Sequence, residues 1–463
     1  MTAVKETRMS NIKDKIKHVV VLMLENRSLD NMMGFLYPDR PEFNGIPPNT
    51  YFNKIHATGK VYAQPLPASL TSGCLKNPDP DPGEGFDHVN TELNITDDLP
   101  LGDNSGFLRD YFQVTNSAAL APNIMYSYTP EQVPIISQLA KNFAVSDQWF
   151  CSAPTETFPN RLYVATGTSA GLLYDDALFD PSFFQYLADL PTVFNMLNDS
   201  GKTWKSYFHD VAFNWVLLQD GSFLSPNIDH YELRFQFDLD GDNFPDYAFI
   251  EPAYAFFPND EHPPHDVTAG EALIADVYNR ICQSQYWEST LLIITYDEHG
   301  GCYDHVTPPS APPPDGITGS TTPPFTFNRY GLRVPAVFIS PYISRRTIVR
   351  AVPDWNFSPA SLPFDHTTII KTLSNLFDLK LASTGNSYLT QRDKAAPDLF
   401  DYLSLNDSPD NNPGPLTTPH VPLECYLDFE PSSDRKMKFL KLKALAREVM
   451  QAQASAPKSL DKP

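Results

Sequence analysis

The sequence predicts an α/β protein whose central sheet is mostly parallel, with helices on both faces and with loops or small subdomains inserted around it. Two short apolar runs, His18–Leu24 and Leu291–Tyr296, are continuous rather than alternating, which is typical of strands buried on both faces. Helical patterns lie between such runs, at Val133–Asn142, Pro191–Asp199 and Ala269–Ser284. This alternation of strands and helices predicts helices on both sides of one sheet.

A third apolar run and two proline-rich excursions extend this core. Val334–Ile339 has proline at its second position, so we expect an edge strand or a late strand. We interpret Pro38–Pro100 and Thr307–Phe327 as ordered loops or subdomain insertions near the functional site, not as linkers. Because no clean boundary interrupts them, residues 1–430 are predicted to form one domain with insertions, and residues 431–463 a C-terminal helix and a polar tail.

The predicted C-terminal helix carries basic and apolar side chains together, over Asp434–Met450. One interpretation is a basic helix that faces a membrane. The other, which is the commoner arrangement, is a helix docked on its own core with a solvated basic face.

Composition excludes several classes of protein. Hydrophobic residues make up 41% of the 463 residues, which excludes global disorder. A net charge of −22 argues against nucleic-acid binding and should repel anionic membranes, so we expect at most peripheral membrane contact. The charged N-terminus lacks the apolar segment of a secretory signal, and no apolar run reaches the length of a membrane span. We therefore expect a cytoplasmic protein, or one exported without a cleavable signal peptide.

The five cysteines are spread widely along the chain, and none has CxxC spacing. Because the count is odd, at least one thiol is free, lies in an intermolecular bond or is buried as a small hydrophobe. We expect neither a disulfide framework nor a zinc site built from thiolates.

Polar side chains follow directly after the two continuous apolar runs. The first run ends in Glu25 and Asn26, and the second ends in Asp297 and Glu298. Because the carboxyl ends of parallel strands form the edge where open sheets bind ligands, these four side chains are expected to meet there. Three carboxylates and an amide oxygen suit a hard divalent cation such as Ca²⁺, Mg²⁺ or Mn²⁺. Either motif alone is more typical of a capped strand–helix turn; the combination favours the site.

A hydroxyl group that suits nucleophilic catalysis lies between these motifs, at Thr157 in the stretch Ala153–Arg161. A hydroxyl is a poor nucleophile at neutral pH and must be activated by a base or a metal. Thr157 fits this requirement if a cation binds its Oγ and Arg161 fixes the turn or the phosphate. Alone, the stretch would be interpreted as a threonine-rich cap before a helix.

The motifs ENRSLDNMMG, TFPNR and DEHGGCYDHVTPP, in this order, resemble the signature blocks of the bacterial, fungal and plant phosphoesterase family. That family includes non-specific phospholipases C and an acid phosphatase, and it belongs to the alkaline phosphatase superfamily. Further matching stretches are Glu261–Ile274, Arg333–Ile343 and Phe364–Leu373. The resemblance implies an α/β fold of the alkaline phosphatase type, makes residues 1–430 the catalytic domain and predicts hydrolysis of phosphoric ester bonds.

The resemblance also implies a role for each matching residue. The implied metal ligands are Glu25, Asn26, Asp297 and Glu298. Thr157 takes the place of the nucleophile, and Asn160 and Arg161 are the expected phosphate contacts. Three histidines are implied to act in catalysis: His88 as the acid that protonates the leaving alcohol, and His262 and His209 as groups that stabilise the phosphoryl group. His299, His305 and His366 are at least as well explained by structural hydrogen bonds.

Substrate preference is predicted by the excursions rather than by the motifs. The stretches Pro38–Phe52, Ala253–Pro264 and Pro308–Phe327 are rich in proline and aromatic residues and would supply an apolar wall around a charged centre. Such a site suits an amphiphile, so we expect a phospholipase C that releases diacylglycerol and a phosphorylated headgroup. The alternatives are an acid phosphatase of soluble phosphomonoesters and an inactive scaffold on the same fold.

Overall fold

The computed structural model describes residues 2–427, apart from 55–58, 71–72, 176–185, 188 and 218–224. The predicted C-terminal helix and tail lie outside the described residues. Within them, eight strands form the central sheet, in the order β13 (Thr347–Ile348), β6 (Ala144–Ser146), β12 (Ala336–Ile339), β11 (Thr290–Tyr296), β1 (His18–Leu24), β10 (Tyr247–Ile250), β8 (Trp204–Phe208) and β9 (Ile228–His230).

The sheet is mostly parallel, as predicted. β1 lies at its centre and pairs in parallel with β11 on one side and β10 on the other. β10, β8 and β9 continue the parallel arrangement, whereas β12 is antiparallel to both β11 and β6. β1 and β11 end level with each other, because Leu24 is the register partner of Tyr296.

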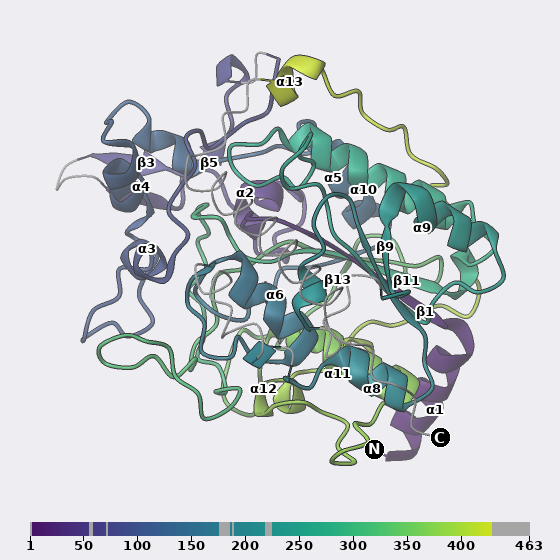
Figure 1. The fold of residues 1–463 in the computed structure, drawn as a ribbon. Helices are drawn as coiled ribbons and strands as arrows, with labels where there is room; N and C mark the ends of the chain where they lie inside the picture. The colour runs from purple at the N-terminus through teal and green to yellow at the C-terminus, as the bar shows by residue number, and fades with distance from the viewer. Residues whose placement is uncertain are drawn as a thin grey trace, which may run out of the picture.

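Helices cover both faces of this sheet: α6, α8 and α11 lie on one side, and α5, α9 and α10 on the other (Figure 1). The helix bounds are α1 (Thr2–Lys15), α2 (Leu29–Met33), α3 (Phe86–Glu92), α4 (Phe107–Thr115), α5 (Pro134–Asn142), α6 (Thr157–Thr166), α8 (Val193–Asp199), α9 (Tyr231–Asp240), α10 (Val267–Cys282), α11 (Thr367–Phe377), α12 (Gln391–Ala395) and α13 (Leu423–Leu427). The fold class predicted from the sequence is thereby confirmed.

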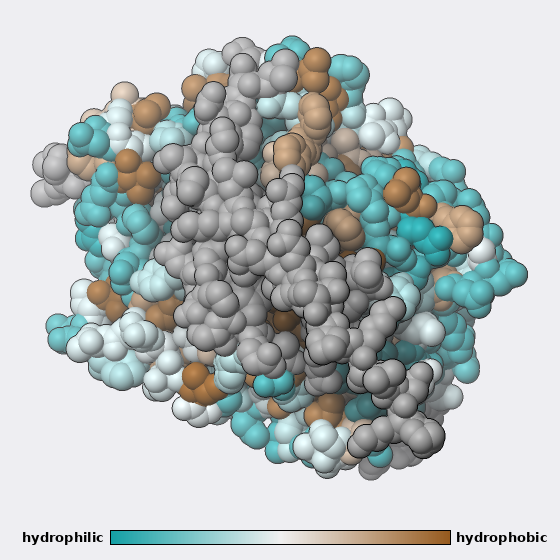
Figure 2. Space-filling view, in the orientation of Figure 1, coloured by the Kyte–Doolittle hydropathy of each residue, from teal (hydrophilic) through white to brown (hydrophobic). Residues whose placement is uncertain are grey.

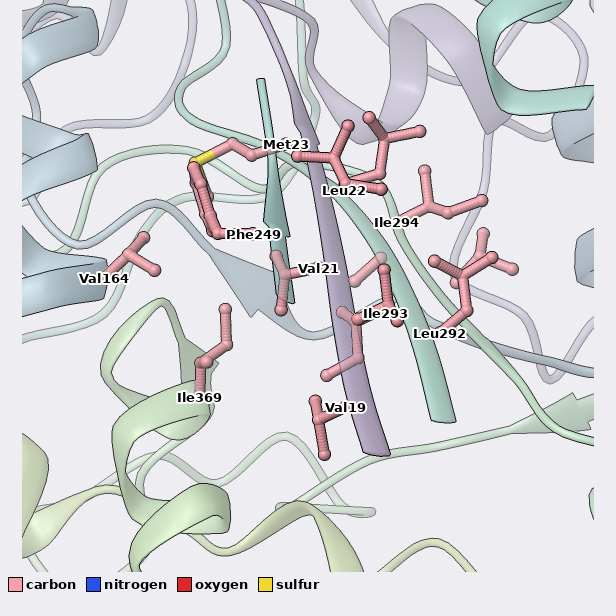
Figure 3. Close-up of a cluster of buried hydrophobic side chains, with 14 of the residues drawn as sticks. Val19, Val21, Leu22, Met23, Val164, Phe249, Leu292, Ile293, Ile294 and Ile369 are labelled. Carbon is pink, nitrogen blue, oxygen red and sulfur yellow. The ribbon is translucent and has the colours of Figure 1, made fainter. Parts of the chain in front are cut away.

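The core lies on both faces of β1, because successive side chains of a strand point in opposite directions. Figure 3 shows Val21 and Met23 directed towards Val164 of α6, whereas Leu22 is directed to the opposite side together with Ile294 of β11. All five side chains are buried. A strand with two buried faces needs a continuous apolar sequence, which explains why both central strands were recognisable.

Two predicted boundaries and one predicted position differ from the structure. The helices predicted at Pro191 and Ala269 begin at Val193 and Val267, because Thr192 and Asp266 accept backbone N–H groups as N-caps. The third apolar run lies inside the sheet, between β11 and β6, so it is a late strand in the chain but not an edge strand. Proline is tolerated there because the paired strand begins only after it; the Pro335 carbonyl instead accepts the hydroxyl hydrogen of Thr295.

The excursion 38–100 is ordered over its described residues and packs against α4. It contains α3 and the short strands β2 (Phe52–Lys54), β3 (Lys60–Tyr62) and β4 (Gln64–Pro65), the last of which pairs with β5 (Tyr126–Ser127). A separate apolar cluster holds it in place, and it includes Val89, Leu93, Phe107, Tyr111 and Ile124. Outside the central sheet, β7 (Trp149–Phe150) also pairs with β14 (Phe364–Asp365).

The cysteines depart in part from expectation. Cys74 and Cys425 form one disulfide across a sequence separation of 351 residues, where no disulfide framework was expected. Such a long-range pair carries no spacing signal. Cys151, Cys282 and Cys302 are free thiols, so the expected free thiol is present. Among the described residues, no helix is both long enough and apolar enough to cross a membrane.

Candidate active site

The two turns that follow β1 and β11 pack directly on each other. The backbone N–H of Asn26 donates a hydrogen bond to Asp297 Oδ1 at 3.0 Å, and Asn26 adopts a left-handed φ of 59°. Gly300 (φ 61°) lies against the same turn; a Cβ on it would be 2.1 Å from the Asn26 carbonyl oxygen. Only glycine permits this approach. Glu25, Asn26, Asp297 and Glu298 are thus brought to one edge, and all four are buried.

Thr157 reaches this edge from the first turn of α6. Its hydroxyl donates a hydrogen bond to Asn26 Oδ1 at 3.0 Å, and the residue is 5% exposed. The preceding turn is fixed by Asn160, whose Nδ2 donates to the carbonyl oxygens of Ala153, Thr155 and Glu156 and whose Oδ1 accepts the Ala153 N–H. The structure therefore places Asn160 beneath the turn, with its amide engaged by backbone rather than directed at a substrate.

Arg161, one turn further along α6, contacts two of the acidic side chains. Its Nε donates to Asp297 Oδ2 at 2.9 Å, and its Nη2 lies 3.8 Å from Glu25 Oε1. Nη2 also donates to the carbonyl oxygens of Met23 and Leu24 at the end of β1. Nη1 is buried without a hydrogen-bond partner in the described part of the chain. In this arrangement the guanidinium orients the acidic cluster, and its Nη1 donor is not used by that cluster.

Negative charge exceeds positive charge at this edge. Burial raises the pKa of Asp297 and raises that of Glu298 to about 8, because a buried carboxylate loses its hydration; nearby Glu84 adds repulsion on Glu298, which His299 opposes. Glu298 Oε2 accepts the Gly300 N–H at 2.8 Å, but Oε1 is buried without a hydrogen-bond partner among the described residues. A buried carboxylate oxygen without a donor, in an oxygen-rich and negatively charged cluster, fits a bound divalent cation.

Of the three predicted histidines, His262 is the one that contacts this cluster. Its Nε2 lies 3.3 Å from Glu84 Oε2, and the same oxygen accepts a 2.6 Å hydrogen bond from Asn26 Nδ2. A connected path therefore runs from the Thr157 hydroxyl through the Asn26 amide and the Glu84 carboxylate to the His262 ring. Asp81 joins the group, with Oδ1 3.6 Å from His262 Nδ1. The ligand atoms of Asp81, Glu84 and His262 lie within 4.8 Å of one another.

The other two predicted histidines make their contacts elsewhere. His88, in α3, bonds through Nδ1 to the Asp110 carboxylate at 2.9 Å, which raises the pKa of the imidazole; its side chain is 43% exposed. His209 follows β8, donates from Nδ1 to the Glu251 carbonyl oxygen at 2.7 Å and stacks on the Tyr231 ring. Burial lowers the pKa of His209. The structure does not bring either ring into the contacts of Thr157 or Asn26 described above.

Three further residues contact the site, although the sequence motifs did not predict these contacts. Glu84 and Asp81 come from the sequence PDPDPGEG in the excursion 38–100, where acidic residues between proline and glycine were the only available signal. His366 shares a 2.6 Å hydrogen bond at Nε2 with the Asp297 carbonyl oxygen, while its Nδ1 accepts from Trp149 Nε1. Burial lowers the pKa of His366 to about 4, so it is a neutral donor that positions Asp297.

The site gathers a helix-borne hydroxyl, oxygen ligands for a cation and a histidine at the carboxyl edge of an α/β sheet, as in metal-assisted hydrolases. The family model described as "Phosphoesterase family" matches residues 16–380. The chain belongs to this family and is a hydrolase of phosphoric ester bonds. The resemblance carried by the signature motifs is confirmed.

Curated relatives support the same placement. Non-specific phospholipase C6 of Arabidopsis thaliana is 33% identical over 88% of this chain and 75% of its own length. Non-specific phospholipase C1 of the same plant is 34% identical over 86% and 73%. Phospholipase C B of Mycobacterium tuberculosis is 26% identical over 78% and 73%.

Similarity to solved structures is more distant. The lipoteichoic acid synthase LtaP of Listeria monocytogenes gives a TM-score of 0.40 at 11% identity, covering 98% of this chain and 99% of its own. An alkaline phosphatase superfamily protein from Vibrio parahaemolyticus gives 0.34 at 14% identity, covering 71% and 84%. Likenesses of this strength carry no argument about substrate.

Proposed function

We propose that this chain is a metal-dependent phospholipase C that cleaves glycerophospholipids into diacylglycerol and a phosphorylated headgroup, with Thr157 as nucleophile. The observation that carries the proposal is the 3.0 Å contact between the Thr157 hydroxyl and Asn26 at an edge with three buried carboxylates. The names of the relatives support a lipid substrate over a soluble one.

Glu25, Asn26, Asp297 and Glu298 would hold the cation, for which their oxygen atoms favour Ca²⁺, Mg²⁺ or Mn²⁺. When bound, the cation supplies charge neutralisation at the phosphoryl oxygens and lowers the pKa of the nucleophilic hydroxyl. Arg161 holds Asp297 and Glu25 in place. His366 fixes the Asp297 backbone through its carbonyl oxygen.

The Thr157 oxygen attacks phosphorus, and the bond from phosphorus to the diacylglycerol oxygen breaks. This leaves a threonine phosphodiester that still carries the headgroup. The departing oxygen takes up the proton that the Thr157 hydroxyl gave up on attack. Water then attacks phosphorus and loses a proton, which passes to the Thr157 oxygen, so that the phosphorylated headgroup is released and the Thr157 hydroxyl is restored. We assign both proton transfers to His262, supported by Glu84. His262 replaces His88 in this role because His262 Nε2 lies 3.3 Å from Glu84, whereas His88 Nδ1 is held by Asp110.

Substrate class is tested by incubating the enzyme and Ca²⁺, Mg²⁺ or Mn²⁺ with phosphatidylcholine vesicles, and separately with phosphomonoesters at equal phosphate concentration. Diacylglycerol and inorganic phosphate are then quantified. We expect diacylglycerol with little inorganic phosphate. Abundant inorganic phosphate from monoesters with no diacylglycerol from any lipid would instead define an acid phosphatase. Metal binding without turnover of either substrate would define an inactive scaffold.

The disulfide bears on where the protein works. Disulfides persist in oxidising compartments and are rare where thiols are kept reduced. Cys74–Cys425 therefore supports the exported alternative over the cytoplasmic one. Non-reducing peptide mass spectrometry of protein isolated from its source organism tests this, because a cytoplasmic protein would carry both cysteines as free thiols.

A further inference from the structure

The loop between β10 and α10 joins the candidate active site to an exposed aromatic tip. At its far end, the Asp260 carbonyl oxygen accepts the Glu25 N–H at 2.8 Å, and His262 follows two residues later. At its centre, Phe256 is 63% exposed and Phe257 is 62% exposed. Four residues separate the exposed Phe257 from His262, whose ring contacts Glu84.

The tip is held outward by its backbone. The Asp210 carboxylate accepts the N–H groups of Tyr254, Ala255 and Phe256 at 2.8 to 3.2 Å. The loop is closed below the tip by Asn259, which exchanges hydrogen bonds with Ala253 through its backbone N–H and its Oδ1. Because these bonds fix the chain on both sides, the two phenylalanines cannot fold back onto the core without breaking them.

Helix α13 extends the exposed apolar surface beside this tip. The Tyr426 ring packs edge-on against Phe257, with centroids 5.5 Å apart. Leu423, in the first turn of α13, is 59% exposed, and the Cys74–Cys425 disulfide fixes the helix to the loop that leads to Glu84. In Figure 2, hydrophobic residues gather around α13 at the top of the view. We call Phe256, Phe257 and Leu423 the docking tip.

Charge decides what kind of surface the docking tip fits. Residues 252–259 carry no ionisable charge, in a chain whose net charge is −22. An anionic surface would be repelled by the rest of the protein, and a basic protein partner would find a single acidic side chain, Glu424, among residues 252–259 and 423–427. Exposed aromatic rings without charge suit the boundary between headgroups and acyl chains of a neutral bilayer.

We propose that the docking tip inserts into a zwitterionic phospholipid surface and thereby places the His262 edge of the site against the headgroups. The proposal rests on the proposed function for its purpose, since only an amphiphilic substrate requires it. Binding to the surface is a separate property of the tip and is measured separately from hydrolysis.

Vesicle binding is measured by flotation of the full-length protein carrying Thr157→Ala, so that the lipid is not consumed. Phe256→Ser with Phe257→Ser in the same background is expected to weaken binding to phosphatidylcholine vesicles by about tenfold or more, because two aromatic rings no longer leave water. The matched control is Phe237→Ser, which is also 63% exposed but lies in the second turn of α9, outside the loop between β10 and α10. The control is expected to bind as the parent does.

Two further measurements separate docking from chemistry. In the wild-type background, the double variant Phe256→Ser with Phe257→Ser should hydrolyse soluble bis-p-nitrophenyl phosphate at an unchanged rate. Its rate of hydrolysis of phospholipid in vesicles should be lower. Binding should fall when phosphatidylserine is added and should not fall when salt is raised, because insertion of uncharged rings is not screened.

Three results would overturn the proposal: equal vesicle binding by the double variant and the control, binding that requires anionic lipid, or a dimer in solution that the same substitutions dissociate. Vesicle binding through the tip without diacylglycerol production would leave the inference in place and contradict the proposed function.

Discussion

Two buried acidic clusters are built from the same two segments, residues 25–31 and 297–305, and they balance their charges in opposite ways. In the first, Asp30 and Asp304 surround Arg333. In the second, the active-site cluster, Asp297 and its neighbours carry more negative than positive charge. Both clusters are equally removed from water, so burial by itself does not distinguish a functional site from a structural one.

The cluster around Arg333 is complete within the chain. Arg333 donates to Asp30 Oδ1 and to Asp304 Oδ1, both at 3.0 Å, and His305 Nδ1 bonds to Asp30 Oδ2 at 2.6 Å. Burial alone would raise the pKa of Asp30, but His305 and Arg333 hold it below its ordinary value. Every charge has an opposite neighbour, so this cluster needs no ligand.

The active-site cluster is incomplete within the chain. Arg161 is the guanidinium that faces Glu25 and Asp297, and one oxygen of Glu298 has no donor among the described residues. The difference teaches that the unbalanced charge, and not the number of carboxylates, distinguishes the site that we propose for a cation and a phosphate.

The largest expected effect is on turnover, from Thr157→Ala. Removal of the nucleophile should lower kcat by about 10⁴-fold or more, with the melting temperature unchanged, because one hydroxyl at the site contributes little to folding. Thr157→Ser should retain part of the activity. Acid quenching followed by mass spectrometry should find the headgroup phosphate on Thr157 in the wild type. A near-wild-type rate for Thr157→Ala would exclude the proposed mechanism.

The next largest effect is on stability, from Arg333→Met. Loss of the Arg333 guanidinium leaves Asp304 buried without its ion-pair partner and Asp30 with His305 alone, which should lower the free energy of unfolding by about 3–5 kcal/mol. Denaturant titration measures this, and elemental analysis should find the metal content unchanged. Loss of metal at wild-type stability would show that the two clusters are not distinct. Arg346→Met, which breaks an exposed pair with Asp39, is the control and should change little.

The opposite pattern is expected at the active-site cluster. Asp297→Asn with Glu298→Gln should abolish stoichiometric binding of a divalent cation, because it removes two charged ligands. In the presence of a chelator, the variant should differ little in stability from the wild type, because relief of repulsion among the buried carboxylates offsets the lost ion pair between Asp297 and Arg161. Elemental analysis and melting temperatures with and without chelator measure both effects. A variant that keeps its metal would contradict the assignment of these ligands.

The proposed proton transfer predicts different effects on kcat for substitutions of His262 and of His88. His262→Ala and Glu84→Gln are each expected to lower kcat by about 10²-fold on a soluble phosphodiester and to shift its pH profile. His88→Ala should lower kcat less than tenfold and leave the profile unchanged, because His88 bonds to Asp110 outside the cluster. A larger loss for His88→Ala than for His262→Ala would return the acid role to His88.

The sheet and the placement of the four predicted ligands follow from sequence because the signals are local. β1 and β11 are continuous apolar runs, and the acidic turns follow them without a gap. Parallel pairing then brings Leu24 and Tyr296 level, which places both turns at one edge. The placement of Thr157 rests on its motif; the catalytic role of each residue stays a prediction.

Long-range contacts could not be predicted in this way. Glu84 reaches Asn26 from an excursion whose path is set by its apolar cluster with α4 and not by periodicity. His88 lies four residues further on, one turn into α3, so the same excursion directs it towards Asp110 instead. The partner of Cys74 lies 351 residues away, and proximity over that distance leaves no pattern in the sequence.

A third buried acidic pair consists of Glu261 and Glu271, and here a proton balances the charge. The smallest of the expected effects is predicted at this pair. Glu261 Oε2 accepts the Tyr296 hydroxyl hydrogen, while Oε1 is buried without a hydrogen-bond partner in the described structure. Burial raises the pKa of Glu261 well above its ordinary value, and the neighbouring Glu271 raises it further. Glu271 itself accepts the N–H groups of Ile135 and Ile136 at the start of α5, so the proton belongs on Glu261.

A carboxyl whose pKa is raised on folding keeps a proton that the unfolded chain releases above about pH 4.3, so the free energy of unfolding falls as pH rises beyond that value. Glu261→Gln replaces the protonated carboxyl with a neutral amide and should remove this dependence. Melting temperatures are compared from pH 5 to pH 8 with saturating divalent cation, which keeps the active-site carboxylates ionised throughout. Between pH 5 and pH 8, the melting temperature of the wild type should fall by a few degrees relative to that of Glu261→Gln. Glu232→Gln, at a partly exposed position on α9, is the control and should follow the wild type. Parallel curves for wild type and Glu261→Gln would show that Glu261 is ionised when folded, and that a surplus of buried charge can persist without a cation or a proton.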